Sequence, residues 1–328
     1  MAAIDDVLQK LNPWRKDSLT PPPPPSPPLT PTRAYLLISL YALLYFIPFY
    51  LSPLTRPSPT LSRDAPSVIR ARIRSVILST IICLITTYFI IAHNSPSSQN
   101  PFHLLGFYPV SLSSTLKPVL LTALLFLGPL YSHFIIDGGL KPWLSLQPLK
   151  EAFTDYQSYR NYVIGPLTEE LLFRSSALPL LLPPTPPSTP YSLLYIVPLI
   201  FGLSHIHHYY EFTRQNPSVP TTAALLRSIF QLGYTTLFGA YATFLYLRTG
   251  SLYAVCLVHT FCNCMGLPQV WGRVEFPDEY LGGQRRSILW SVGYYVLLIS
   301  GAVLWYKNLW TLSASEHGLV RYDAWRRS

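Results

Sequence analysis

The 328-residue chain is 49% hydrophobic and only 12% charged, whereas in a soluble domain about a quarter of the residues are charged. This shortage of charge indicates a membrane protein. The formal net charge of +9 fits loops that face anionic lipid headgroups; the sequence has no basic stripe with interleaved aromatic residues, so it does not indicate nucleic-acid binding.

Residues 1–33 form a predicted N-terminal tail that is rich in proline. Ile4, Val7, Leu8 and Leu11 have the spacing of a short amphipathic helix, which we expect to lie at the membrane surface. The prolines that follow favour a polyproline II spacer. The tail lacks the pattern of a cleavable signal peptide, so we expect the first long apolar run to act as the targeting signal.

Eight apolar runs follow, each judged against the roughly 20 residues that a helix needs to span a bilayer. The first, second, third and eighth have no charge in the middle, so we predict that they form a scaffold. The fourth to seventh carry Glu, Arg, His and Asn, which belong on helix faces that point into a bundle. The eight runs lie near 34–54, 75–93, 117–136, 159–182, 191–210, 222–247, 251–268 and 287–307.

These runs predict an all-α polytopic membrane protein, in which about eight transmembrane helices form a bundle around an intramembrane polar cavity. We expect the transmembrane domain over 34–310, with its catalytic core over about 159–272. A short C-terminal tail at 311–328 is expected to follow it. The segment 137–158 is expected to lie at the membrane interface rather than to cross it.

The fourth run contains three charged side chains within six residues: Glu169, Glu170 and Arg174. Each charged side chain at mid-membrane depth costs roughly 2.5–3.5 kcal/mol, so these three must be paired, hydrated or used. On a helix, Glu170 and Arg174 are four residues apart and can form an ion pair, whereas Glu169 points about 140° away from Arg174. We therefore predict that Glu170 and Arg174 support the site and that Glu169 faces the reaction space as a general base.

Two later runs offer polar partners to this carboxylate. His205 lies in the apolar part of the fifth run, where it is either part of the site or a satisfied polar residue at a helix end; His207 and His208 are interpreted as ordinary interfacial residues. His259 and Asn263, four residues apart in the seventh run, can both donate to a developing oxyanion, although interhelical hydrogen bonding also explains such residues. The predicted catalytic set that activates water is Glu169, His205, His259 and Asn263.

Three alternatives stay open at this point. The carboxylate and imidazoles are also zinc-ligand types, although the sequence contains no HExxH motif. A thiol nucleophile would need Cys262 or Cys264 beside His259, but nothing in the sequence activates these thiols; with Cys83 and Cys256 they are interpreted as small buried apolar residues. A non-enzymatic transporter or scaffold could bury Glu and His as a proton relay, although the sequence shows no internal repeat of the kind typical of transporters.

The polar residues occur in an order that resembles a known family. The motifs are Glu169-Glu170-x-x-x-Arg174, Phe201-x-x-x-His205 and His259-x-x-x-Asn263. Together they resemble the CAAX-protease and bacteriocin-processing superfamily of intramembrane proteins, and the residues between them resemble the eukaryotic type II CAAX prenyl endopeptidases. The resemblance covers roughly 161–272, and no motif position departs from the family pattern.

This resemblance implies an eight-helix bundle in the endoplasmic reticulum membrane that removes the last three residues from farnesylated or geranylgeranylated CAAX proteins. The partners would be substrates such as Ras-like small GTPases, with the prenyl chain in membrane lipid and the site open to the cytosol. The resemblance assigns water activation to Glu169 and His205, the oxyanion to His259 and Asn263, and a supporting role to the ion pair. The family has been argued as both glutamate-dependent and metal-dependent; we expect no metal cofactor, with zinc as the alternative.

Overall fold

The structure, a computed structural model, describes residues 29–58, 60–94, 100–182, 189–274, 288–320 and 322–327. Within these ranges the regular secondary structure consists of helices, and no strand is present, which confirms the predicted all-α fold. The amphipathic helix predicted near 4–11 and the polyproline spacer lie outside the described residues.

The first half of the chain contributes two long apolar helices and several short ones. α2 starts behind Thr30, whose side chain accepts a hydrogen bond from the backbone N–H of Arg33 and so satisfies one of the free donors at the helix start. The elements of this half of the chain are α2 (Pro31–Phe46), α3 (Pro48–Leu51), α4 (Pro66–Asn94), α5 (Pro101–Leu104), α6 (Leu112–Leu125), α7 (Leu127–Tyr131), the π-helical turn η2 (Ser132–Ile136), α8 (Leu140–Leu144) and α9 (Gln147–Thr154).

The second half carries all the predicted site residues. An almost unbroken helical run from 156 to 181 alternates between α-helical, π-helical and 3₁₀ turns before the longer helices begin. Its elements are α10 (Tyr156–Tyr159), η3 (Arg160–Ile164), α11 (Gly165–Glu170), η4 (Leu171–Ala177), η5 (Leu178–Leu181), α12 (Pro190–Ser204), α13 (His207–Gln215), α14 (Thr221–Thr249), α15 (Leu252–Met265), α16 (Leu289–Leu312) and α17 (Tyr322–Arg327).

Within the described residues, three helical stretches are long and apolar enough to cross a membrane: Pro31–Leu51, α4 and α16. A fourth results if α6 and the run Leu127–Ile136, which are bent by 80° at their junction, count as one span. α15 is apolar but only 14 residues long. The chain is therefore a polytopic membrane protein as predicted, whereas the number of eight spans stays a prediction.

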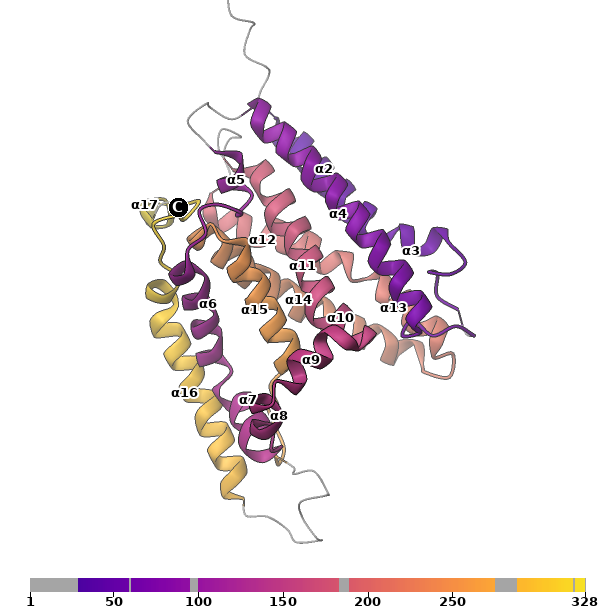
Figure 1. Cartoon of the computed structure of the whole chain (residues 1–328), viewed down its shortest axis with the longest axis vertical. Coiled ribbons are helices and arrows are strands. Elements are labelled where there is room, and N and C mark those ends of the chain that lie inside the picture. The colour runs from indigo at the N-terminus through magenta and orange to yellow at the C-terminus, as the bar shows by residue number, and fades with distance from the viewer. Residues whose placement is uncertain are drawn as a thin grey trace, which may run out of the picture.

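The site helices lie between two outer pairs of helices (Figure 1). α2 and α4 pack together on one flank, and α6 and α16 pack together on the opposite flank, with α11, α12, α14 and α15 between them. α12 and α14 approach closely because small residues stand at their contact: a Cβ on Gly239 would lie 3.2 Å from the Cα of Pro198. Close packing through small residues is typical of membrane helices.

A proline explains how the helix that carries the glutamates docks on α15. Pro166 has no N–H to donate to the carbonyl of Tyr162, four residues earlier. The hydroxyl of Thr260 on α15 donates to this carbonyl instead, at 2.8 Å. The backbone on either side takes the π-helical turns η3 and η4, which occur frequently at functional sites. The result is that α11 and α15 face each other at the level of the glutamates.

Two segments expected outside the bundle proper are helical. The interfacial segment contains α8 and α9, and large apolar side chains such as Leu144 and Phe153 are 77% and 62% exposed there, which suits a helix lying on a membrane surface. The predicted C-terminal tail folds back: Trp325 on α17 is 3% exposed and packs edge-on against Tyr191 and Phe244.

Candidate active site

A cavity of about 380 Å³ opens between α4, the α10–α11 run, the α12–α13 junction and α15. Three of the four predicted catalytic residues line it: Glu169, His205 and Asn263. The fourth, His259, is 6% exposed and lies directly next to the lining carboxylate. The folded chain thus brings together residues that are separated by more than 90 positions in the sequence.

The ion pair expected from the i, i+4 spacing is present and completely buried. Nη1 of Arg174 lies 3.1 Å from Oε1 of Glu170, and both side chains have no exposed surface. Nη2 of Arg174 donates to the carbonyl oxygen of Gly239 on α14 at 3.1 Å, and the ring of Phe201 lies 4.7 Å beneath the guanidinium. The pair therefore ties the glutamate helix to α12 and α14.

His259 lies between the two glutamates, an arrangement that the spacing alone did not predict. Nδ1 of His259 donates a hydrogen bond to Oε1 of Glu170 at 2.7 Å, so this oxygen accepts hydrogen bonds from both the imidazole and Arg174. Nε2 of the same ring lies 3.9 Å from Oε2 of Glu169. Glu170 thus orients the imidazole, because the ring that donates to it through Nδ1 turns its other nitrogen toward Glu169.

Glu169 differs from its neighbour in accessibility. Its side chain is 21% exposed, against 0% for Glu170. No hydrogen bond reaches its carboxylate from the part of the chain that the structure describes, and its one near partner is His259. A carboxylate that can meet water and is not occupied by a donor is suited to act as a general base.

His205 and Asn263 face the same cavity from opposite helices. Nδ1 of His205 donates to the carbonyl oxygen of Phe201 at 2.8 Å, which leaves Nε2 for the cavity. Nδ2 of Asn263 donates to the carbonyl oxygen of Asn161 at 2.9 Å and keeps a second N–H. Within the described ranges, no hydrogen bond or ion pair joins His205 directly to Glu169.

Sequence reasoning missed an ion-pair network beside these residues. Glu211 on α13 is 1% exposed, and its carboxylate lies 2.6 Å from Nη1 of Arg72 and 3.4 Å from Nη1 of Arg63. Burial raises the pKa of Glu211, but the hydrogen bond from His208 and the two arginine charges outweigh this effect and set it at about 2. The usable signal in the sequence was the i, i+3 spacing of His208 and Glu211 on one helix face.

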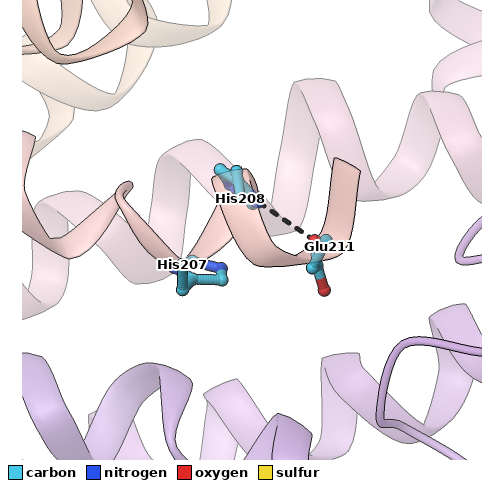
Figure 2. A group of neighbouring side chains, drawn as sticks. All are labelled: His207, His208 and Glu211. Carbon is cyan, nitrogen blue, oxygen red and sulfur yellow. Dashed lines mark hydrogen bonds and ion pairs between the residues drawn. The ribbon is translucent and has the colours of Figure 1, made fainter. Parts of the chain in front are cut away.

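His207, His208 and Glu211 form a compact group with potential ligand atoms within 4.8 Å of one another (Figure 2). Figure 2 shows His208 pointing toward Glu211, to which its Nδ1 donates at 3.1 Å. A divalent cation at this place would have to share the carboxylate with two guanidinium groups. We therefore interpret the group as part of the ion-pair network; His207 and His208, expected to be ordinary interfacial residues, both line the cavity.

Comparison with known proteins supports the resemblance read from the motifs. The family described as type II CAAX prenyl endopeptidase Rce1-like matches residues 155–265, a stretch that contains all six predicted site residues. The chain is 36% identical to the "Probable CAAX prenyl protease 2" of Schizosaccharomyces pombe over 285 residues, which is 87% of this chain and 96% of the relative.

Two further relatives have the same description. The chain is 34% identical to the "CAAX prenyl protease 2" of Homo sapiens, over 80% of each chain. It is 29% identical to the "CAAX prenyl protease 2" of Saccharomyces cerevisiae, over 85% of this chain and 95% of the relative. No solved structure matches the chain.

Proposed function

The chain belongs to the type II CAAX prenyl endopeptidase family, and we propose that it removes the C-terminal aaX tripeptide from farnesylated or geranylgeranylated CAAX proteins by activating water at Glu169. The observation that carries the mechanism is the contrast between the two adjacent glutamates. Glu170 is buried and committed to Arg174 and His259, whereas Glu169 is accessible and faces the cavity.

Glu169 and His205 together activate the water. Both line one cavity, and we place the water molecule between the carboxylate and the free Nε2 of the imidazole. Glu169 takes a proton from this water as the oxygen attacks the carbonyl carbon of the prenylated cysteine. The bond from this carbon to the nitrogen of the next residue then breaks, and Glu169 returns the proton to that nitrogen as the tripeptide leaves. His205 holds the water through Nε2, because its Nδ1 is already bonded to the carbonyl oxygen of Phe201.

His259 and Asn263 stabilise the negative oxygen that forms on the attacked carbonyl group. His259 is held by Glu170 through Nδ1, and in this proposal the Nε2 side of the ring donates to the oxyanion. The second N–H of the Asn263 amide is the other donor. Fixed donors of this kind contribute much of the catalysis in acyl transfer, about 10²–10³ in rate for a single donor.

We propose that this reaction needs no metal ion. Glu170 is not free to act as a metal ligand through Oε1, because this oxygen accepts hydrogen bonds from Arg174 and His259, and the sequence contains no HExxH motif. Zinc remains the alternative, because the free nitrogens of His205 and His259 and the carboxylate of Glu169 are zinc-ligand types. Purified enzyme should keep its activity after exhaustive chelation; loss of activity that zinc restores would favour the metal scheme.

We further propose that the protein lies in the endoplasmic reticulum membrane with its cavity open to the cytosol, and that Ras-like small GTPases are among its substrates. A prenylated C-terminus suits a site that is close to the membrane surface. The prenyl chain belongs in lipid, whereas the polar tripeptide must reach a hydrated cavity. Cells that lack the protein should accumulate prenylated CAAX proteins that still carry their last three residues.

Glu169→Gln tests the proposal directly. The variant should insert and fold, since the glutamine has the same shape and the side chain has no hydrogen bond to lose in the described part of the chain. It should cleave a farnesylated CAAX peptide at least about 10³-fold more slowly, because the general base is missing. Normal cleavage by a folded Glu169→Gln protein would remove Glu169 from the mechanism.

A further inference from the structure

Three arginines from separate parts of the chain line the cavity: Arg63 in the loop before α4, Arg72 on α4 and Arg160 on η3. We call them the arginine cluster. Two carboxylates are paired with them, Asp64 and Glu211. Three positive charges against two negative ones leave the cluster with one positive charge in excess.

Arg72 is the most buried of the three arginines, and each of its three nitrogens already has a partner. Its Nε and Nη2 both donate to the carbonyl oxygen of Thr55, at 3.0 and 2.6 Å, and its Nη1 lies 2.6 Å from Glu211. The side chain is only 10% exposed. This arginine links the loop before α4 to the middle of α13, so the arginines that remain for a ligand are the other two.

Arg63 and Arg160 keep free donors. Arg160 uses Nε for the side-chain oxygen of Asn161 at 2.9 Å and Nη1 for Asp64 at 2.8 Å. Arg63 has looser contacts, 3.4 Å to Glu211 and 3.9 Å to Asp64. Among the described residues, Nη2 of both arginines has no partner, and their side chains are 33% and 21% exposed. These two guanidinium groups can therefore bind an anion that enters the cavity.

The distance along the helix fits a particular anion. Arg160 and Glu169 stand nine residues apart on one continuous helical run that begins with the π-helical turn η3, so the separation along its axis is at most about 13–14 Å, the value for an α-helix at 1.5 Å per residue. A tripeptide in extended form spans about 10–11 Å at 3.3–3.6 Å per residue. A peptide whose scissile carbonyl group lies at Glu169 can thus place its last carboxylate within reach of the flexible Arg160 side chain.

We propose that Arg63 and Arg160 bind the free α-carboxylate of the substrate's C-terminal residue, and so set the length of peptide that is removed. This inference rests on the proposed function. Among the described residues that line the cavity, the one carboxylate is Glu169. The substrate's own carboxylate is therefore repelled at the catalytic end and attracted at the arginine end, which gives the tripeptide one direction and one register.

The test uses two farnesylated CAAX peptides that differ only at the last carbonyl group, one with the free carboxylate and one with a carboxamide. The intact protein in vesicles of neutral lipid should cleave the carboxylate peptide with at least about tenfold higher kcat/KM, mainly through a lower KM, because a charge-assisted hydrogen bond is lost in the amide. In Arg63→Gln and Arg160→Gln this preference should fall toward one. Arg74→Gln is the matched control, since Arg74 is an exposed arginine on α4 that does not line the cavity.

Each other outcome overturns a specific statement. Equal cleavage of both peptides by the unaltered protein would refute carboxylate binding and leave the proposed function intact. Cleavage of neither peptide would instead refute the proposed function. If the arginine variants lost activity equally on both peptides, and only in vesicles that contain anionic lipid, the arginines would serve a lipid phosphate and the inference would be wrong. Thermal unfolding of each variant separates these results from misfolding.

Discussion

Replacing Glu170 by glutamine keeps the shape of the side chain but removes the negative charge that Arg174 and His259 share. In the structure, Oε1 of Glu170 is 3.1 Å from Nη1 of Arg174 and 2.7 Å from Nδ1 of His259. Neither Glu170 nor Arg174 has any exposed side-chain surface. Water therefore cannot replace the lost partner, and the guanidinium charge stays buried beside a neutral amide.

The expected cost follows from this burial. Removing one partner of a buried ion pair typically destabilises a protein by about 3–5 kcal/mol. Glutamine still accepts one hydrogen bond, and the ring of Phe201 still lies beneath Arg174, so we expect about 3 kcal/mol. At about 2–4 °C per kcal/mol this corresponds to a decrease in Tm of about 6–12 °C. Cleavage should fall as well, because His259 loses the group that orients it.

The assay is thermal unfolding of the purified protein together with cleavage of a farnesylated CAAX peptide. Glu169→Gln is the matched control at the adjacent position: its side chain is 21% exposed, so its Tm should stay near that of the unaltered protein although its activity is lost. A second control is the double variant Glu170→Gln, Arg174→Met. Because it removes the unpaired charge, it should recover at least half of the lost stability without recovering activity.

The two single variants test whether the buried ion pair stabilises the site and whether Glu170 orients His259. If Glu170→Gln unfolded at the same temperature as Glu169→Gln, burial of the ion pair would not be what stabilises the site. If Glu170→Gln kept full activity, the hydrogen bond between Glu170 and His259 would not orient the imidazole.

Three further predictions concern other parts of the molecule. Trp325→Ala should lower the free energy of unfolding by up to about 3–5 kcal/mol, because it leaves a cavity where the buried indole packs. Cleavage at low temperature should be unchanged. A Tm equal to that of the unaltered protein would show that α17 does not stabilise the bundle. The pKa of Glu211 is lowered from its usual value of 4.5 to about 2. The ionised carboxylate therefore stabilises the fold fully above pH 4.5, and this stabilisation is lost as the pH falls toward 2. Glu211→Gln should therefore be less stable than the unaltered protein at pH 6, with a gap in Tm that narrows on acidification; a gap that is constant with pH would contradict the ion-pair network. A protein without thiols should remain active, and inactivity with an intact fold would revive a thiol mechanism; the four replaced residues are Cys83, Cys256, Cys262 and Cys264.

The class of fold, one buried ion pair and the family could be predicted from local patterns. The shortage of charge and the apolar runs indicated a helical membrane protein, because hydrocarbon requires each segment to satisfy its own backbone. The i, i+4 spacing of Glu170 and Arg174 predicted an ion pair that the structure contains, because neighbours on one helix face meet wherever the helix lies. Three polar motifs in order sufficed to indicate the family, which the comparisons then confirmed.

Contacts between distant segments could not be predicted in this way. The hydrogen bond from His259 to Glu170 depends on how α15 docks against α11. Part of this docking is the hydrogen bond from Thr260 to the carbonyl oxygen of Tyr162, which has no helical donor because Pro166 lacks an N–H. The arginine cluster likewise joins the loop before α4 to η3 and α13. The sequence alone determined which polar groups needed a partner or water, since the cost of placing each charged group in a membrane is local. Only the tertiary structure decided which of these groups share a carboxylate, since helix rotation and depth result from packing of the whole bundle.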